Sequence, residues 1–308
     1  MVSQTTALPL RIEEDARLQT GLATLADYWS LTKPEVNLLI LITTLAGFCL
    51  AVPSPIQHFP VLLLINTLLG TLLVASGTGT LNQFLERNFD AQMRRTSRRP
   101  VASGRITPAN ALCFGIALSC LGCVYLLVTV NSLSSLLALI TLLSYLFLYT
   151  PLKRKTPLCV LVGALPGAMP PLIGWAGAVG SLNLEAWSLY TILFLWQFPH
   201  FMAIAWMYRE DYSRAGYLVL PRGNARGEVM ALQSVLPSLL LIPVGIIPML
   251  LAHSHLPYRA ASVLLSLAFL LFAMRLAFQR SNVTAKRLLF ASIIYLPIVF
   301  FVLLLSKI

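Results

Sequence analysis

Three oxygen-bearing side chains recur at every fourth position directly after a long apolar run. Asn82, Glu86 and Asp90 follow the run 59–81, and on a helix they lie on one face. An amide oxygen and two carboxylates are the hard ligands that Mg²⁺ takes when it also binds substrate phosphates. This spacing therefore indicates a metal-assisted diphosphate site.

Arginines surround this acidic motif. Arg87 lies inside it, and Arg95 and Arg99 are two of the four arginines that follow Asp90 within ten residues. Guanidinium groups bind phosphate oxygens through pairs of hydrogen bonds. A simpler interpretation is a solvated loop whose arginines only set the orientation in a membrane. The helical spacing of the acids, at the very end of an apolar span, favours the diphosphate site.

Two further segments carry charges at the ends of apolar runs. Lys153 and Arg154 follow a proline that stops a span, and the sequence leaves open whether they contact phosphate or only anchor the topology. Glu210 and Asp211 lie after the span four later than the first motif, on the same side of the membrane. Two such parallel segments suggest an internal duplication with the site between the halves.

A single histidine lies on the same side as these acids. His200 is eleven residues before Asp211, so an unbroken helix would place both on one face, although Pro199 adjoins it. A histidine within a span is a functional hypothesis. A hydrogen-bonded structural histidine is an equal alternative.

The elements that position these groups are membrane spans. The chain has 308 residues, 57% hydrophobic and 11% charged, with a mean hydropathy of +0.80, which excludes a soluble globular protein. Without barrel-like alternation, the fold class is an all-α polytopic membrane protein. Runs of about twenty apolar residues predict nine transmembrane helices at 36–52, 59–81, 109–130, 133–150, 157–179, 187–208, 229–252, 258–279 and 287–305.

The distribution of charge predicts the orientation. The net charge is +11, and 20 of the 22 lysines and arginines fall in the N-terminal tail or in alternate connections. The other two, Arg259 and Lys307, lie on the opposite side. Because cytoplasmic loops are rich in lysine and arginine, the N-terminus and the acidic motifs are expected in the cytoplasm and the C-terminus outside. The basicity is therefore not evidence for nucleic-acid binding.

Two regions make up the chain. Residues 1–35 form a polar lead in which Leu18, Leu22, Leu25 and Trp29 recur at helical spacing, as in a helix on the membrane surface. Residues 36–308 form the membrane domain. Its fifth span contains glycines and prolines that weaken a helix in lipid, which is tolerated where it lines a cavity or packs tightly.

The motifs together resemble those of the protohaem IX farnesyltransferase (haem O synthase) family, a branch of the UbiA-type intramembrane prenyltransferases. The likeness runs from about residue 28 to the end and includes the Trp-Gln-x-Pro-His segment at 196–200. It implies nine helices around a central lipid-open cavity, farnesyl diphosphate as donor, haem b as acceptor and Mg²⁺ as cofactor. It also implies a bacterial inner membrane location and a downstream haem A synthase as partner.

The resemblance also implies roles for individual residues. Catalytic roles fall on Asn82, Glu86, Asp90, Glu210 and Asp211, of which all but Glu210 would be metal ligands. Substrate contacts fall on Arg87, Arg95, Arg99, Lys153, Arg154, His200, Tyr208, Arg209 and Tyr212. The chain departs from the family where Glu86 replaces the usual aspartate. It also departs from the wider superfamily, whose second aspartate pair falls on two tyrosines here.

These observations predict a prenyltransferase. Cations hold the diphosphate and stabilise its charge as it leaves, and the farnesyl group is transferred to a haem vinyl group. Two alternatives are a prenyltransferase that acts on a quinone precursor and a transporter of haem or lipid. A transporter explains the duplication but does not explain acids and arginines clustered on one side only.

The charge asymmetry gives a test of orientation. Single cysteines introduced at Ser97 and Asn224, in a background that lacks the five native cysteines, are expected to resist an impermeant thiol reagent in intact cells. The same positions are expected to react in inverted vesicles. Labelling from outside at either position would reverse the orientation and move the candidate site to the other side of the membrane.

Overall fold

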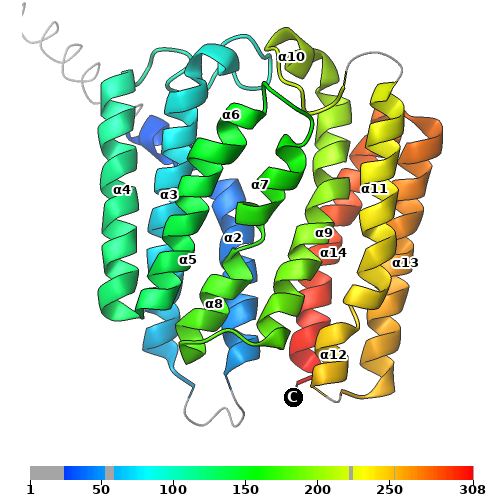
Figure 1. The fold of residues 1–308 in the computed structure, drawn as a ribbon. Helices are drawn as coiled ribbons and strands as arrows, with labels where there is room; N and C mark the ends of the chain where they lie inside the picture. Colours follow the sequence, from blue (N-terminus) through cyan, green and yellow to red (C-terminus); the bar gives the residue numbers. More distant parts are fainter. Residues whose placement is uncertain (1–23, 53–58, 222–224, 253, 308) are drawn as a thin grey trace, which may run out of the picture.

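The helices run alongside one another as a bundle (Figure 1). The computed structural model describes residues 24–52, 59–221, 225–252 and 254–307, and these contain helices and no strand. The elements are α2 (Pro34–Ala51), α3 (Val61–Asp90), α4 (Pro108–Thr129), α5 (Ser132–Leu143), the π-helical η2 (Ser144–Tyr149), α6 (Thr150–Leu152), α7 (Cys159–Gly167), α8 (Pro170–Val179), α9 (Leu184–Met207), α10 (Arg209–Arg214), α11 (Ala225–Val244), α12 (Ile247–Leu251), α13 (Leu256–Gln279) and α14 (Asn282–Leu305).

Within the described residues, nine helical segments are long and apolar enough to cross a membrane, which confirms the predicted class and number of spans. α3 extends well beyond the predicted end of its span at residue 81. Its 30 residues continue to Asp90, so the acidic motif lies on the last turns of a helix, as its spacing predicted. We call the end of the bundle at which α3 ends the motif end.

Two spans are interrupted. The fifth span is divided into α7 and α8 just before Pro170, and the seventh is divided into α11 and α12 near Gly245. The first interruption agrees with the prediction that prolines break the helical hydrogen bonds of the fifth span. Pro199, in contrast, lies inside α9 without ending it.

Glycines bring two pairs of helices close together. A Cβ atom at Gly77 would lie 2.2 Å from the Ser119 hydroxyl, and one at Gly122 would lie 2.7 Å from Val74, so α3 and α4 pack almost backbone to backbone. In the same way, a Cβ atom at Gly174 of α8 would lie 2.0 Å from the Thr44 carbonyl oxygen of α2. Small residues at such positions are typical of helix packing in membranes.

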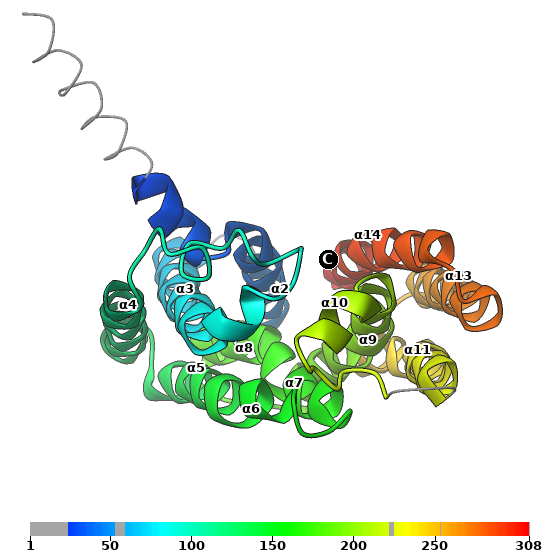
Figure 2. The same ribbon diagram turned by 90° about the horizontal axis from the view of Figure 1, so that it is seen from above.

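The helices form two groups, which are separated in the view along the bundle (Figure 2). One group contains α2, α3, α4, α5, η2, α6, α7 and α8, and the other contains α9, α10, α11, α12, α13 and α14. The groups meet where α9 packs on α7 and α8 and where α14 packs on α2. Internal duplication stays a prediction, since α8, from the fifth span, packs with the first group.

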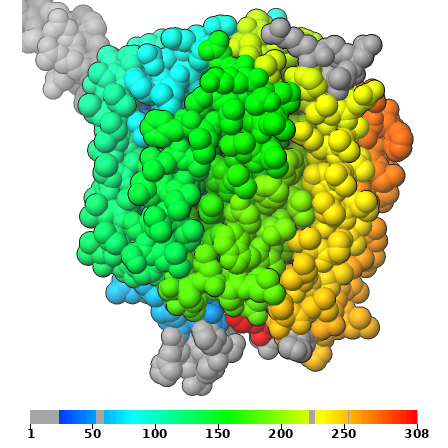
Figure 3. Space-filling view, in the orientation of Figure 1, coloured from blue at the N-terminus to red at the C-terminus, as the bar shows by residue number. Residues whose placement is uncertain are grey.

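The outside of the bundle is apolar. In the space-filling view, side chains of α5, α6, α7, α9 and α11 form one face of the molecule (Figure 3). Large apolar side chains on these helices are exposed, among them Leu136, Ile140, Leu232 and Leu236. A surface of this kind matches the hydrocarbon of a bilayer.

The N-terminal lead is described from residue 24, so Leu18 and Leu22 lie outside the described residues. Residues 24–31 are helical, and Leu25 and Trp29 are exposed, in agreement with a helix on a membrane surface. The Gln83 side chain of α3 donates hydrogen bonds to the backbone oxygens of Ser30 and Leu31, both at 3.3 Å. These bonds fix the lead beside the last turns of α3.

The close contact of α2 and α8 gives a stability prediction. Gly174→Ala places a methyl group on the Thr44 carbonyl and is expected to destabilise the chain by about 1–3 kcal/mol, because overpacked helices must move apart. Gly79→Ala is the matched control, since its methyl group meets its nearest neighbour at an ordinary 3.5 Å. There, alanine is expected to be neutral or stabilising by up to about 1 kcal/mol. Unfolding by SDS in mixed micelles measures the change in the free energy of unfolding in both variants. Equal changes would contradict the close packing of α2 and α8.

Candidate active site

The acidic motif is turned into the protein. Asn82, Glu86 and Asp90 are 2%, 4% and 1% exposed, although they lie at the end of a span where water is near. Buried charged groups require partners, because the loss of hydration is otherwise too costly. Each of these side chains meets a cation from another part of the chain.

Asn82 meets a lysine from the start of the first span. Lys33 Nζ donates to Asn82 Oδ1 at 2.8 Å, and Asn82 Nδ2 is 3.4 Å from the Thr150 hydroxyl. The backbone of Lys33 is left-handed, with φ 54°, and this residue joins the lead to α2. Exclusion of water, together with repulsion from Arg99, lowers the pKa of Lys33 to about 7.

Glu86 forms an ion pair with Lys153, from the connection after α6. The Lys153 Nζ–Glu86 Oε1 distance is 2.7 Å, and both side chains are largely buried. The ammonium lies 4.5 Å from the centre of the Tyr149 ring and 5.9 Å from that of Tyr217. Burial acts against the charge on Lys153, but the Glu86 carboxylate outweighs it and raises the pKa of this lysine well above its usual value. Lys153 therefore stays protonated.

Asp90 keeps one free oxygen. Its Oδ2 accepts a hydrogen bond from Arg99 Nη1 at 2.7 Å, and the Thr96 hydroxyl donates to its backbone oxygen at 3.0 Å. Its Oδ1 is buried without a hydrogen-bond partner. A buried carboxylate oxygen in this condition is costly, and a cation is its natural partner. The side-chain oxygens of Asn82, Glu86 and Asp90 lie on one helical face, and Asp90 Oδ1 is open. This arrangement fits the preference of Mg²⁺ for oxygen ligands.

Asp211 reaches this region from the other group of helices. It is 7% exposed on α10. Its Oδ1 accepts from Arg214 at 2.8 Å, and its Oδ2 accepts from the backbone N–H of Arg95 at 3.3 Å. The second acidic segment is thus joined to the loop that follows the first, 116 residues earlier in the chain.

The carboxylates do not form a compact cluster. Among the described residues, no three histidine, cysteine, aspartate or glutamate side chains lie close enough together to hold a metal ion. A site built on Asp90 would therefore depend on substrate oxygens and water for its remaining ligands. That is the usual way in which proteins bind Mg²⁺ with phosphates.

Other predicted site residues divide into two sets. The guanidinium groups of Arg95 and Arg154 lie over the rings of Tyr208 and Phe89 at the motif end, 5.0 and 4.3 Å from the ring centres. Tyr212 packs against Tyr217 there, with 6.0 Å between ring centres. These residues lie at the same end of the bundle as the acidic motif.

The second set points elsewhere. Arg87 donates to the Phe84 carbonyl of its own helix at 2.7 Å. Arg209 donates to Asn282 at 2.7 Å, toward α14, and Glu210 is exposed. The structure does not bring these three side chains to the Asn82, Glu86 and Asp90 face.

The His200 side chain, on α9, lies against α14. Its Nδ1 is 2.8 Å from the Ser292 hydroxyl, and its ring stacks on Trp196 with 4.7 Å between centres. The helix between His200 and Asp211 is interrupted, because α9 ends at Met207 and α10 begins at Arg209. The break is at Tyr208 and not at Pro199, so spacing along the chain does not place His200 and Asp211 on one face.

Lys33 was missed as a site residue. From sequence it marks only the entry to the first span, next to a proline. The available signal was a lysine on the same side of the membrane as the acids, but its contact with Asn82 joins residues 49 positions apart. Such a contact leaves no local pattern in the sequence.

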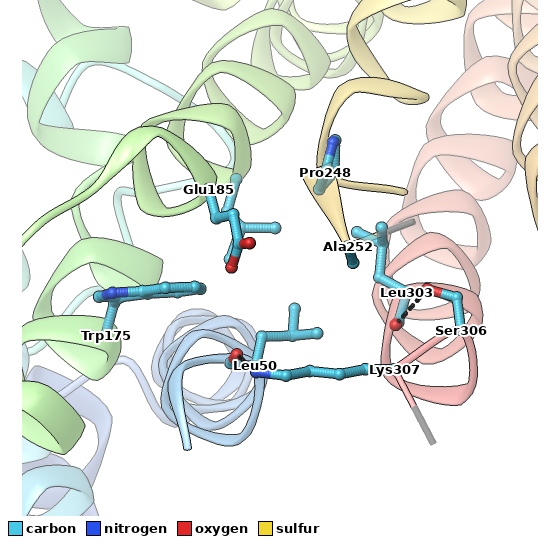
Figure 4. A pocket seen from close by; sticks show the side chains of 9 residues that line it. Leu50, Trp175, Glu185, Pro248, Ala252, Leu303, Ser306 and Lys307 are labelled. Atoms are coloured by element: carbon cyan, nitrogen blue, oxygen red, sulfur yellow. Dashed lines mark hydrogen bonds between the residues drawn. The ribbon is translucent and has the colours of Figure 1, made fainter. Parts of the chain in front are cut away.

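A pocket at the opposite end of the bundle is separate from this site (Figure 4). Its empty space is about 300 Å³, including the part open to solvent, and Leu50, Trp175, Glu185 and Lys307 are among its lining residues. Lys307 Nζ donates to the Leu50 carbonyl and lies 6.0 Å from the centre of the Trp175 ring, and burial lowers the pKa of Lys307. This lysine ties the end of α14 to α2.

Comparison with known proteins identifies relatives. The model of the UbiA prenyltransferase family matches residues 40–300. The chain is 46% identical to the protoheme IX farnesyltransferase of Solibacter usitatus over 91% of this chain and 98% of that protein. It is 38% identical to the protoheme IX farnesyltransferase of Aquifex aeolicus, over 92% and 96% of the two chains.

Solved structures share the fold. A digeranylgeranylglyceryl phosphate synthase superposes with a TM-score of 0.72 at 19% identity, over 92% of this chain and 98% of that one. A UbiA homolog from Archaeoglobus fulgidus, bound to GPP and Mg²⁺, superposes with a TM-score of 0.60 at 15% identity, over 90% and 99%.

The buried ion pair of Glu86 and Lys153 gives a second stability prediction. Glu86→Gln leaves the lysine buried without a counterion and is expected to cost about 3 kcal/mol in SDS-induced unfolding. Adding Lys153→Met to Glu86→Gln removes the unpaired charge and is expected to recover most of that loss.

Asp27→Asn is the matched control, because Asp27 pairs with the half-exposed Arg105. Its loss is expected to stay below about 1 kcal/mol. Equal losses at the two pairs, or no recovery in the double variant, would show that Glu86 and Lys153 are not coupled.

Proposed function

The chain belongs to the UbiA prenyltransferase family and, within it, to the protoheme IX farnesyltransferases, and on this premise we propose its reaction. It transfers a farnesyl group from farnesyl diphosphate to a vinyl group of haem b, which gives haem O. The observation that carries the chemistry is the buried face of Asn82, Glu86 and Asp90, with cations on every side.

The donor end of the reaction takes place at this face. Asn82, Glu86 and Asp90, with Asp211 from the other group of helices, would hold Mg²⁺, which supplies positive charge to the departing diphosphate. Support comes from the free Oδ1 of Asp90 and from the related Archaeoglobus fulgidus protein bound to GPP and Mg²⁺.

The basic residues orient the diphosphate. Arg95, Arg99, Lys153 and Arg154 provide guanidinium and ammonium donors around the acidic face, and they stabilise the negative charge that grows on the leaving oxygens. The bond between C1 of the farnesyl group and the diphosphate oxygen breaks, and the electron pair leaves with the diphosphate. Tyr208 and Tyr212 lie beside these cations.

The reaction is completed at the haem, which accepts the farnesyl group. A haem vinyl carbon bonds to C1 of the farnesyl group, and water adds to the resulting cation with loss of one proton. The products are the hydroxyethylfarnesyl side chain, diphosphate and a proton.

The protein is a multi-pass membrane protein with nine candidate spans among its described residues. We place the motif end in the cytoplasm and the C-terminus outside, in a bacterial inner membrane, because the sequence assigns 20 of its 22 lysines and arginines to the N-terminal tail and to the connections on one side of the membrane. Haem O then remains in the bilayer, where a haem A synthase is the partner that receives it.

A product assay with an Asp90 variant tests the reaction. With haem b, farnesyl diphosphate and Mg²⁺, the purified chain is expected to yield haem O by mass spectrometry. Asp90→Asn is expected to lower turnover by about a thousandfold, which corresponds to several kcal/mol of lost charge stabilisation. EDTA is expected to abolish activity.

Glu228→Gln, an exposed acid at the same end of the bundle, is the matched control and should retain activity. Full activity in EDTA would exclude the metal-dependent mechanism. Transfer of the farnesyl group to a quinone precursor but not to haem would show that the acceptor is the quinone precursor.

His200 supports haem binding in this proposal. The Ser292 hydroxyl is bonded to Nδ1, which orients the ring and leaves Nε2 for an axial ligand role. His200→Ala is expected to weaken haem binding, followed by the Soret band, much more than binding of farnesyl diphosphate. Ser292→Ala keeps the imidazole and should change the Soret band less. An unchanged haem spectrum and affinity in His200→Ala would exclude iron ligation.

A further inference from the structure

The oxygens proposed as metal ligands are largely engaged by the chain itself. Asn82 Oδ1 accepts from Lys33 at 2.8 Å, and Glu86 Oε1 pairs with Lys153 at 2.7 Å. Asp90 differs, because Arg99 binds only its Oδ2 and its Oδ1 is free. A metal ion can therefore reach Asp90 without breaking an ion pair, but it cannot reach these oxygens of Asn82 and Glu86 without competing with a lysine.

The displaced lysines would then lack a partner. The Lys153 side chain is 12% exposed, and its ammonium lies 4.5 and 5.9 Å from the centres of the Tyr149 and Tyr217 rings. An ammonium in such a place that loses its carboxylate is strongly destabilised. Lys33 is constrained as well, because Gln83 holds the backbone just before it at Ser30 and Leu31. The backbone oxygen of Lys153 accepts from the N–H of Leu218 at 2.6 Å, so the backbone at or beside each lysine is held in place.

A diphosphate removes this penalty. Its oxygens accept hydrogen bonds from ammonium groups, and a lysine has three donors on a flexible stem that can turn from one acceptor to another. The lysines lie beside the same oxygens that would bind the metal ion, so the diphosphate of a metal complex would arrive within their reach.

We propose that Lys33 and Lys153 are positioning residues that make binding of the metal ion depend on binding of diphosphate. Each lysine occupies a ligand oxygen and is released to a diphosphate oxygen when the metal ion takes its place. The inference rests on the proposed function and deepens it, since it makes the metal–diphosphate complex, and not the free ion, the species that the site accepts. By linkage, diphosphate binding must depend on the metal ion to the same degree.

Metal binding to the full-length chain in nanodiscs tests this proposal. Mn²⁺ serves as the probe for Mg²⁺, because free Mn²⁺ is measured directly by electron paramagnetic resonance. Lys153→Gln and Lys33→Gln are expected to bind Mn²⁺ alone about tenfold more tightly than the original chain, because the competing ammonium is gone. Lys286→Gln, at an exposed position on α14, is the matched control and should bind as the original chain does.

A second titration contains inorganic pyrophosphate. The improvement in Mn²⁺ affinity that pyrophosphate causes is expected to be about tenfold larger in the original chain than in either lysine variant. Complexes of Mn²⁺ with pyrophosphate in solution are the same for every protein and cancel in this comparison. If one variant does not fold, the other decides, because the two lysines contact different ligands.

Two results would overturn the inference. Lysine variants that bind Mn²⁺ alone no more tightly than the original chain would show that the lysines do not compete with the metal ion. An equal effect of pyrophosphate in all proteins would show that they do not couple the two ligands. Neither result touches the proposed function, which fails only if the original chain makes no haem O in the product assay.

Discussion

The pairing of buried charge at the end of α3 is the constraint on which the rest of the motif end depends. Two carboxylates and an amide are almost fully buried within three turns of one helix. Their partners, Lys33, Lys153 and Arg99, come from three separate connections of the bundle. Because a buried charge without a partner is strongly destabilising, the fold must hold the start of α2, the end of α6 and the loop after α3 against one face. The chemistry of the site and the stability of the fold therefore both require these cations to lie against the end of α3.

The placement of Lys153 shows how packing in the membrane supports this arrangement. The π-helical η2 ends at Tyr149, and Gly163 of α7 leaves no room for a Cβ atom beneath that ring, since such an atom would lie 2.5 Å from it. The ring in turn lies against the Lys153 ammonium. The backbone oxygen of Lys153 accepts from the N–H of Leu218 at 2.6 Å, which joins it to the segment after α10. Gly163 and the backbone hydrogen bond from Leu218 thus help to hold the Lys153 side chain in place. The π-helical form of η2 fits this role, because π-helical turns often occur at functional sites.

Much of this could be predicted from the sequence, because it depends on local periodicity. Apolar runs predicted nine spans, and the spacing of Asn82, Glu86 and Asp90 predicted their shared helix. Contacts between distant residues could not be predicted in this way. The pairing of His200 with Ser292 joins residues 92 positions apart, and that of Lys33 with Asn82 joins residues 49 apart. The end of α9 at Met207 lies within one residue of the predicted span end at 208, but the short helix α10 that follows was not predicted, because no glycine or proline separates the two helices.

The length of α3 has a consequence for how the products separate. A helix of 30 residues is roughly 45 Å long, whereas the hydrocarbon of a bilayer is about 30 Å thick. With the motif end at one surface of the bilayer, its last turns extend past the hydrocarbon to the level of the lipid head groups. A reaction that breaks a bond at this level divides its products between two phases. Diphosphate dissolves in water and the prenylated product partitions into lipid, so reversal would require the two to meet again across the interface. The position of one helix end thus lets each product leave directly into the phase in which it dissolves.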